Sequence, residues 1–293
     1  MNLQEYIPPV IYELTLRSRR LGSLALAKAV LATVGCPHES IVEGEIKPYF
    51  ELKIFAENFD RITRLEGLFR NLKIKFLAIR VKILRPDDWL TRWKKTWRPA
   101  RLTKKLDVVP VWYKDKYRVQ PKRDYILMDT LLSFGTGLHE TTRFMAQMIE
   151  DCRGQFHSLL DIGTGTGILA IVALKHGAKD VLAVDIGSLS VQAARDNRAA
   201  NGVDFKIQKA DIARWQQKKK YDFVAANLIT HDLISYKENI VRCIKGKGLL
   251  AVSGISLEHL RGLRTAFGQL PLHCLKIKKG KQWAALLYQK KMS

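Results

Sequence analysis

The stretch Leu159-Leu160-Asp161-Ile162-Gly163-Thr164-Gly165-Thr166-Gly167-Ile168-Leu169 decides the fold of this chain. It combines an apolar strand, a turn with a glycine at every second position, and the start of an apolar helix. In open α/β sheets this order places a ligand at the carboxyl end of the strand, where nucleotides bind. The stretch therefore predicts a nucleotide-binding edge on a parallel sheet.

The glycine spacing and the nearby carboxylates indicate which nucleotide binds. In the dinucleotide pattern G-x-G-x-x-G, backbone amides cradle a pyrophosphate. Here Gly167 comes one residue early, and the carboxylate of Asp161 would repel phosphate. S-adenosylmethionine is cationic and carries no phosphate, so it fits this turn better than NAD does. Asp185, at the end of the next strand, is placed to accept hydrogen bonds from the ribose hydroxyls, and Asp211, after the third strand, to reach the adenine amino group.

Each of these signals has a purely structural alternative. A glycine turn forms without any ligand, and single aspartates often cap helices or stabilise turns. Their combination, in this order and at these strand ends, favours a methyl-donor site.

The rest of the C-terminal part alternates apolar strands with amphipathic helical stretches. We expect strands at 159–162, 181–184, 205–207, 223–226 and 249–252, followed by a closing hairpin over 272–276 and 283–288. This alternation predicts a doubly wound, Rossmann-like α/β domain with seven strands, spanning 126–293.

The N-terminal part has a different pattern. Its hydrophobic periods predict strands at 11–16, 40–46, 49–56 and 75–84 and helices at 24–34 and 62–72. The order β-α-β-β-α-β predicts a small ferredoxin-like α+β domain over 1–86.

A basic segment connects the two domains, and we assign 87–125 to a linker. Residues 92–123 hold twelve Lys or Arg side chains against two acids, Asp107 and Asp115. At its start Trp89, Trp93 and Trp97 recur every four residues, which makes one aromatic stripe on a helix. Packing against a domain is the common reason for such a stripe, and stacking on RNA bases is the alternative.

Composition narrows the class of protein. The 293 residues include 50 Lys or Arg and 28 Asp or Glu, a formal net charge of +22, which points to an acidic partner such as nucleic acid or to a well-solvated surface. The four cysteines form no metal-ligand spacing, and we expect no metal site. No signal-peptide pattern opens the sequence, and the longest apolar run, 168–174, is too short to span a membrane. We therefore expect a cytoplasmic protein.

Several ordered motifs resemble those of one family. They are Asp87-Asp88-Trp89-Leu90-Thr91-Arg92-Trp93, Phe134-Gly135-Thr136-Gly137-Leu138-His139-Glu140-Thr141-Thr142, the glycine turn, Ala226-Asn227-Leu228 and Ser253-Gly254-Ile255. Together they resemble the ribosomal protein L-eleven methyltransferase family (PrmA), class I enzymes that use S-adenosylmethionine. The resemblance covers nearly the whole chain. It implies methylation of lysine ε-amines and the N-terminal α-amine of a large-subunit ribosomal protein, with the N-terminal domain recognising the substrate.

The resemblance also implies functional residues. Asn227, beside the transferring methyl group, and His139 would be catalytic, and Asn227 would also touch the donor. The other donor-binding residues would be Phe134, Thr136, Gly137, Thr142, Asp161, Gly163, Thr164, Gly165, Gly167, Asp185, Ile186 and Asp211. Structural alternatives are that His139 caps the following helix and that Asn227 only holds the end of its strand.

The chain departs from the family on the acceptor side. Residues 129–133 read Asp-Thr-Leu-Leu-Ser instead of the family's D-P-G-x-A, and Leu138, Glu140 and Asp232 replace a threonine and two prolines. A carboxylate in the pocket would favour the unreactive ammonium, so we expect Glu140 and Asp232 to point away or to bind substrate at a distance. Substrate identity is therefore open to two alternatives, an RNA methyltransferase and a methyltransferase of another basic protein. A donor-binding or ribosome-assembly factor without activity is a third.

The expected partners follow from these points. They are a ribosomal protein, alone or within an assembling ribosomal particle, and RNA held weakly by the basic segment 92–123. We expect a monomer.

Overall fold

The computed structural model describes residues 11–34, 36, 41–46, 48–56, 59–72, 74–84, 97–129 and 137–292. The chain forms two compact units, 1–97 and 98–293. Residues 98–125 of the proposed linker are thus grouped with the second unit. Trp89 and Trp93 lie outside the described residues, and Trp97 is buried.

The first unit has the element order β-α-β-β-α-β within its described residues. Its elements are β1 (Ile11–Ser18), α1 (Leu21–Thr33), β2 (Ile41–Ile46), β3 (Tyr49–Ala56), α2 (Phe59–Asn71) and β4 (Ala78–Leu84). The strands form an antiparallel sheet in the order β2-β3-β1-β4.

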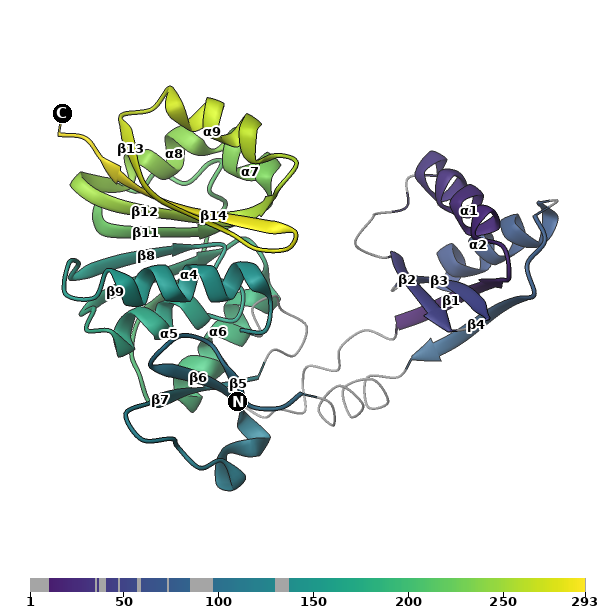
Figure 1. The fold of residues 1–293 in the computed structure, drawn as a ribbon, viewed down its shortest axis with the longest axis horizontal. Helices are drawn as coiled ribbons and strands as arrows, with labels where there is room; N and C mark the ends of the chain where they lie inside the picture. The colour runs from purple at the N-terminus through teal and green to yellow at the C-terminus, as the bar shows by residue number, and fades with distance from the viewer. Residues whose placement is uncertain are drawn as a thin grey trace. The chain divides into compact units, whose positions relative to one another are not determined.

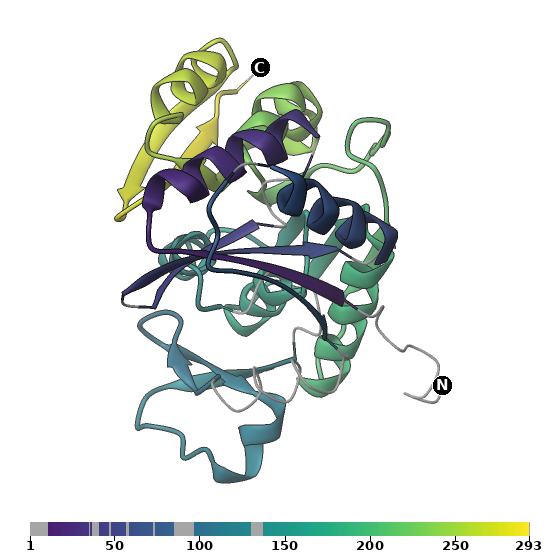
Figure 2. The same ribbon diagram turned by 90° about the vertical axis from the view of Figure 1, so that its right-hand side faces the viewer.

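Period-two alternation sends one set of strand side chains into the core of this unit. Leu14 and Leu16 of β1 lie opposite Ile54 and Leu52 of β3, and all four are fully buried. Leu24 of α1 and Phe69 of α2 join the same cluster. Both helices therefore cover one face of the sheet, as Figure 2 shows.

The second unit carries the elements from β5 onward (Figure 1). These are β5 (Ala100–Arg101), β6 (Leu106–Pro110), the 3₁₀ helix η2 (Val111–Lys116), β7 (Asp124–Met128), α4 (Glu140–Asp151), β8 (Ser158–Ile162), α5 (Ile168–Lys175), β9 (Asp180–Asp185), α6 (Ser188–Ala200), β10 (Lys206–Lys209), β11 (Tyr221–Asn227), α7 (Thr230–Ser235), α8 (Lys237–Arg242), β12 (Ile244–Ser256), α9 (Leu260–Gly268), β13 (Leu272–Lys279) and β14 (Trp283–Lys290).

The large sheet of this unit is mixed. Its strands follow the order β10-β9-β8-β11-β12-β14-β13, and each predicted strand overlaps an observed one. The first five are parallel, whereas β14 runs antiparallel to both β12 and β13. The predicted α/β fold with a parallel core and a closing hairpin is confirmed, and Figure 1 shows β12, β11, β8 and β9 in succession. The carboxyl ends of the parallel strands share one edge.

Helices pack against both faces of this sheet. Leu233, Ile240 and Leu263 from α7, α8 and α9 join one core with strand residues such as Leu160 and Val224. Helices α4, α5 and α6 contact the sheet as well, and the alternate strand residues Leu159 and Phe223 are fully buried too. Both faces are therefore covered, as the apolar strands require.

A small sheet that the sequence analysis did not predict precedes α4. Strand β6 pairs antiparallel with β5 and parallel with β7. Asn197 of α6 and Asn201, the residue that caps this helix, hold β7 and the residue after it: Leu127 N–H donates to the Asn201 side-chain oxygen at 2.8 Å, and Asp129 N–H donates to that of Asn197 at 2.7 Å. Residues 100–128 are thus a folded part of the second unit.

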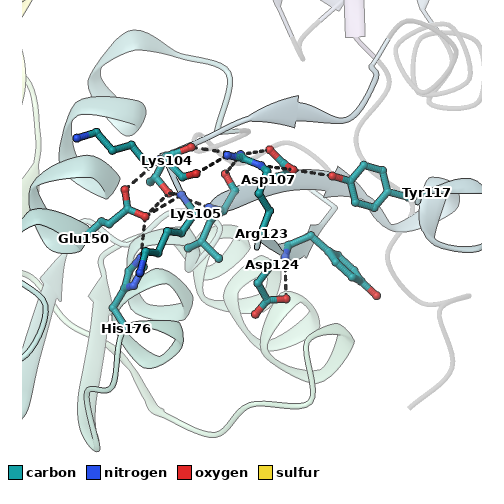
Figure 3. A network of polar contacts seen from close by, with 11 residues as sticks. Lys104, Lys105, Asp107, Tyr117, Arg123, Asp124, Glu150 and His176 are labelled. Carbon is teal, nitrogen blue, oxygen red and sulfur yellow. Dashed lines mark hydrogen bonds and ion pairs between the residues drawn. The ribbon is translucent and has the colours of Figure 1, made fainter. Parts of the chain in front are cut away.

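A buried ion pair holds this small sheet together (Figure 3). Arg123 donates to the Asp107 carboxylate through Nε and Nη2. Its Nη2 also donates to the carbonyls of Thr103 and Leu106, and its Nη1 donates to the carbonyl of Lys104. The side chains of Arg123 and Asp107 are only 8 % and 10 % exposed. Burial alone would raise the pKa of Asp107, but hydrogen bonds from Arg123 and Tyr117 lower it below its ordinary value.

Glu150 of α4 fixes the turn between β5 and β6 in a similar way. Its carboxylate accepts hydrogen bonds from the Thr103 hydroxyl at 3.0 Å and from the backbone amides of Lys104 and Lys105 at 3.0 and 2.9 Å. His176 lies 3.8 Å from the same carboxylate, and burial lowers the pKa of that imidazole. The turn is therefore a rigid wall beside α4.

The described residues contain neither a membrane-spanning helix nor a metal-binding cluster. No helix there is long and apolar enough to cross a membrane. No group of three or more His, Cys, Asp or Glu side chains in that part of the chain is arranged to hold a metal ion.

We expect Arg123→Met to lower the free energy of unfolding by about 3 kcal/mol, because it leaves the buried carboxylate of Asp107 without its partner. The measurement is chemical denaturation at pH 7. The exposed Arg118→Met is the control and should change stability by less than about 0.5 kcal/mol.

The ion pair between Arg123 and Asp107 should also make the stability of the fold depend on pH. Because folding lowers the pKa of Asp107, the contribution of the ion pair to the free energy of unfolding is complete above about pH 4, the ordinary carboxyl value. This contribution is lost as the pH falls through the lowered pKa. The stability gap between wild type and Arg123→Met should therefore shrink below pH 4. A gap that stays constant down to pH 2 would contradict this role of the ion pair.

Candidate functional site

The glycine turn after β8 has the conformation that its residues predict. Gly163, Gly165 and Gly167 all have positive φ, at 68°, 54° and 80°. At Gly163 a Cβ atom would overlap the side chain of Leu228, so only glycine fits there without displacing Leu228. Gly167 occupies the N-cap position of α5. The backbone of the turn thus lies open at the carboxyl edge of the sheet.

Asp185, the last residue of β9, fastens this turn. One of its carboxylate oxygens accepts a hydrogen bond from Gly165 N–H at 2.9 Å, and the other accepts from Gly187 N–H at 2.8 Å. The amides of Gly163 and Thr164 bond to the carbonyl of Val184 at 2.9 and 3.0 Å. Strand end and turn are therefore held in one geometry, with the carboxylate at the surface of a cavity.

Asp161 lies beneath the turn and is fully buried. One carboxylate oxygen accepts a hydrogen bond from the Thr164 hydroxyl at 2.6 Å, and the other, Oδ1, has no partner among the described residues. Burial and the charge of nearby Asp185 raise the pKa of Asp161 to about 7, against the effect of the Thr164 hydrogen bond. Neither Asp161 nor Thr164 lines the cavity, so their influence on a ligand passes through the turn and through charge.

The cavity has a volume of about 490 Å³, at the carboxyl edge of the large sheet. It brings together residues from the ends of β8, β9, β11, β12 and β14 and from the segments that follow them. Its lining is His139, Thr141, Ile162, Gly163, Gly165, Val184, Asp185, Ile186, Ser190, Ala210, Asp211, Ile212, Asn227, Leu228, Ile229, Asp232, Tyr236, Gly254 and Trp283.

Six of the predicted donor-binding residues thus meet in one place. Gly163, Gly165, Asp185, Ile186, Asp211 and Asn227 all line the cavity. Asp211 also accepts a hydrogen bond from Ala213 N–H at 2.9 Å, the turn role noted as its structural alternative. Ile186 is 65 % exposed at the wall, which leaves an apolar surface for a flat ring.

The remaining predicted residues lie elsewhere. Gly137 has φ 75° and packs on Ile168 and Val108, outside the cavity lining. Thr142 is buried in α4, and its hydroxyl has no partner among the described residues. Phe134 and Thr136 fall outside the described residues.

His139 caps a helix, which is its structural alternative, and also lies at the cavity. It is the N-cap of α4, where its Nδ1 accepts a hydrogen bond from Thr141 N–H at 3.4 Å and lies 2.8 Å from the Thr141 hydroxyl. Its ring packs edge-on against Trp283, with centroids 5.3 Å apart. Burial lowers the pKa of this imidazole, so it is neutral at pH 7. His139 therefore caps a helix and also lines the cavity.

Asn227 ends β11 with its side chain at the cavity. Its side-chain amide makes no hydrogen bond to any of the described residues, so both its donor and its acceptor are available. The next residue, Leu228, packs closely against Gly254. Gly254 has φ 88°, and a Cβ atom there would overlap the Leu228 carbonyl. This tight contact sets the path of the chain out of the strand.

The two unusual carboxylates of the acceptor side differ in placement. Glu140 accepts a hydrogen bond from Lys281 N–H at 3.2 Å and packs over Gly280 of the β13–β14 turn, outside the cavity lining. The expectation that it points away is confirmed. Asp232 does line the cavity, so for this residue the expectation of a side chain pointing away is wrong, and binding substrate at a distance is the alternative that stays.

Sequence reasoning missed several lining residues. Trp283 opens β14 and lies opposite Ser256 of β12, which brings it to the same edge as Asn227. Ser190, Ile229 and Tyr236 come from helix starts and loops. Asn197 was also missed: it is fully buried and donates to the carbonyls of Thr166 and Asp129 at 2.9 and 2.8 Å, linking the glycine turn to the segment before residue 130. Asparagine inside a helix gave no signal for this role.

Comparison with known proteins gives a consistent result. The profile of the family described as "Ribosomal protein L11 methyltransferase (PrmA)" matches residues 28–291. A protein of that name from Dictyoglomus turgidum is 32 % identical over 246 residues, covering 83 % of this chain and 80 % of its own. Another from Thermoanaerobacter pseudethanolicus is 31 % identical over 255 residues, covering 85 % and 82 %.

A solved structure agrees with these relatives. The crystal structure of a ribosomal protein L11 methylase from Lactobacillus delbrueckii subsp. bulgaricus superposes with a TM-score of 0.62 and 31 % identity, covering 67 % of this chain and all of that one. The cavity at the strand ends and the matched length together lead to one conclusion: the chain belongs to the ribosomal protein L11 methyltransferase (PrmA) family of S-adenosylmethionine-dependent enzymes.

Proposed function

We propose that this protein transfers methyl groups from S-adenosylmethionine to amino groups of ribosomal protein L11, on lysine side chains, the N-terminus or both. The observation that carries the proposal is the cavity in which Gly163, Gly165 and Asp185 adjoin Asn227. Membership of the PrmA family supports the identity of the substrate.

The residues present fit the methyl donor. The open turn at Gly163 and Gly165 leaves room for a ligand against the backbone, and the carboxylates of Asp185 and Asp211 offer acceptors for hydroxyl and amino groups. The buried charge of Asp161 favours a cation beside the turn. Ile186 and Ile212 supply apolar surface for the adenine ring. S-adenosylmethionine, when bound, supplies a methyl group activated by a sulfonium.

The chain's own task is then to align a neutral amine. Methyl transfer to nitrogen is an in-line displacement, so positioning contributes most of the catalysis. Asn227, free to accept or donate, would orient the amine lone pair. Neutral His139 and Trp283 make the adjoining wall aromatic, and such a wall favours the uncharged amine over the ammonium. Asp232 would hold other cationic groups of the substrate near the entrance.

The finer architecture belongs to the same proposal. The strand order of the first unit supports a ferredoxin-like domain that recognises the substrate, and the second unit supports a class I methyltransferase domain of seven strands. We further propose a cytoplasmic monomer that meets L11 alone or within an assembling ribosomal particle, with weak RNA contact through the basic residues of 92–123.

The direct test is transfer of labelled methyl groups from S-adenosylmethionine to purified L11. We expect label in the protein, and we expect Asn227→Ala to lower kcat by at least about tenfold, because the amine loses its orienting partner. Binding of the donor, measured by calorimetry, should change far less. Nuclease-sensitive label in RNA, or no label in protein with donor binding intact, would contradict the proposal.

A second prediction concerns the donor site. Asp185→Asn removes the charge and one of two amide contacts, and hydrogen bonds to a charged group contribute about 1.5–3 kcal/mol. We expect the dissociation constant for S-adenosylmethionine to rise by about two orders of magnitude. Asp196→Asn, on the exposed side of α6, is the matched control and should bind the donor as wild type does. Equal affinities for all three proteins would exclude Asp185 from the site.

A third prediction uses the raised pKa of Asp161. A cationic ligand favours its carboxylate, so binding must release the proton that Asp161 holds below about pH 7. Donor affinity should therefore fall by about tenfold more between pH 8 and pH 6 in wild type than in Asp161→Asn. Titration calorimetry over this range provides the test, and parallel pH profiles would show that Asp161 does not sense the ligand charge.

A further inference from the structure

A second concave surface lies beside the catalytic cavity in the same unit. It is a groove of about 400 Å³ between the β5–β6 turn and α4. Its lining is Arg101, Leu102, Thr103, Lys104, Glu140, Arg143, Phe144 and Gln147. Methyl transfer, as proposed above, makes no use of this groove.

Three cations of the groove have no acidic partner within ion-pair distance among the described residues. These are Arg101, Lys104 and Arg143, all exposed. Figure 3 shows the side chain of Lys104 extending away from the network of Asp107, Arg123 and Glu150.

The nearby carboxylates are engaged elsewhere. Glu140 bonds to the amide of Lys281, and Glu150 accepts hydrogen bonds from Thr103, Lys104 and Lys105. The groove therefore presents positive charge on walls that are already fixed.

Strand β13 adds further positive charge nearby. Lys278 donates to the side-chain oxygen of Gln147, a groove residue, at 2.6 Å. Lys276 pairs with Asp151 at 2.7 Å, so its charge is partly balanced. Burial and the charges of Lys276 and Lys104 lower the pKa of Lys278, whereas the charge of Asp151 raises it. The amines of Lys104, Lys276 and Lys278 are therefore close enough to repel one another. An anion in the groove would relieve this crowding.

We propose that this groove binds the sugar-phosphate backbone of single-stranded RNA. Arg101, Lys104 and Arg143 line one groove and can supply the charge-assisted contacts that phosphates take. Phe144 lies among them in the lining, and cations around an aromatic ring are the combination that single-stranded nucleic acid uses. An acidic protein segment would use the positive charges of the groove but would have no need of the aromatic ring of Phe144.

The groove differs from the basic segment recognised in the sequence. Of the twelve basic residues in 92–123, only Arg101 and Lys104 line it, and Arg143 comes from α4. Arg123, by contrast, is buried against Asp107 and does not face solvent. The RNA contact is thus assigned to a three-dimensional surface, not to a linear stretch.

The groove lies next to the catalytic cavity, so RNA bound there could take part in methyl transfer. This step rests on the proposed function. His139 and Thr141 at the start of α4 line the catalytic cavity, while Glu140 and Arg143, on the same turn of that helix, line the groove. RNA held there lies beside the entrance for the acceptor amine. A ribosomal protein bound to RNA would then be presented together with its RNA.

The test is binding of a fluorescent 20-nucleotide single-stranded RNA to the full chain, without donor or L11. The groove variant is Arg101→Ala/Lys104→Ala/Arg143→Ala. Its dissociation constant should rise by about 100-fold at 0.1 M salt, and the slope of log affinity against log salt should fall by about 2, since each phosphate contact contributes about 0.7. Donor affinity and melting temperature, measured in parallel, should stay at the wild-type values.

A matched control separates this groove from net charge. Lys179→Ala/Arg195→Ala/Lys206→Ala removes three exposed cations around β9, α6 and β10, at the opposite edge of the sheet from β13. Its RNA affinity should change less than threefold. Equal losses in both triple variants, or no RNA binding by wild type, would overturn the proposal.

A further competition experiment separates RNA from acidic protein. Poly-glutamate of the same charge should displace the RNA at least tenfold less effectively than unlabelled RNA does, and equal displacement would overturn the assignment to RNA. Because neither L11 nor methyl transfer enters these measurements, their failure is distinct from failure of the proposed function.

Discussion

The carboxylate of Asp185 joins two parts of the chain that the rest of the site depends on. Its oxygens accept the amides of Gly165 and Gly187, so the turn after β8 and the turn after β9 are fixed to each other at the end of two neighbouring parallel strands. A carboxylate with two backbone donors holds its geometry without any ligand. The turn therefore holds one geometry without a ligand, and in the proposed donor site its ordering would cost little on binding.

Asp161 performs a related task at a higher energetic cost. It is fully buried with one oxygen unpaired, and its raised pKa reports that cost. A buried carboxylate with a strongly shifted pKa beside a cavity is a candidate functional group, and we propose that a cationic donor benefits from its charge. The hydroxyl of Thr164 satisfies only one oxygen, which leaves the charge free to interact through the turn. Asp185 thus positions the turn, whereas Asp161 adjusts its electrostatic preference.

Sequence patterns predicted the parts of this protein whose signals are local. Strand β8 with its glycine turn, and Asp185 at the end of β9, could be located because an apolar run, a glycine spacing and a strand end are each visible in a short window. Strand β6 was missed because Leu106–Pro110 stands among lysines and arginines, which led us to assign 87–125 to a linker. Trp283 was missed for a different reason: it reaches the cavity only through the antiparallel pairing of β14 with β12, which no local pattern encodes.

The contrast between the donor side and the acceptor side has a physical basis. The residues proposed for the donor lie at strand ends and in a glycine turn, where backbone geometry leaves few alternatives, as the overlap at Gly163 illustrates. On the proposed acceptor side the cavity is lined by Asp232 and Trp283. Glu140 could replace the family's proline because Lys281 and Gly280 of the β13–β14 turn accommodate its carboxylate outside the cavity. Asp232 lines the cavity instead, and we propose that its charge holds a cationic group of the substrate at a distance from the amine that accepts the methyl group.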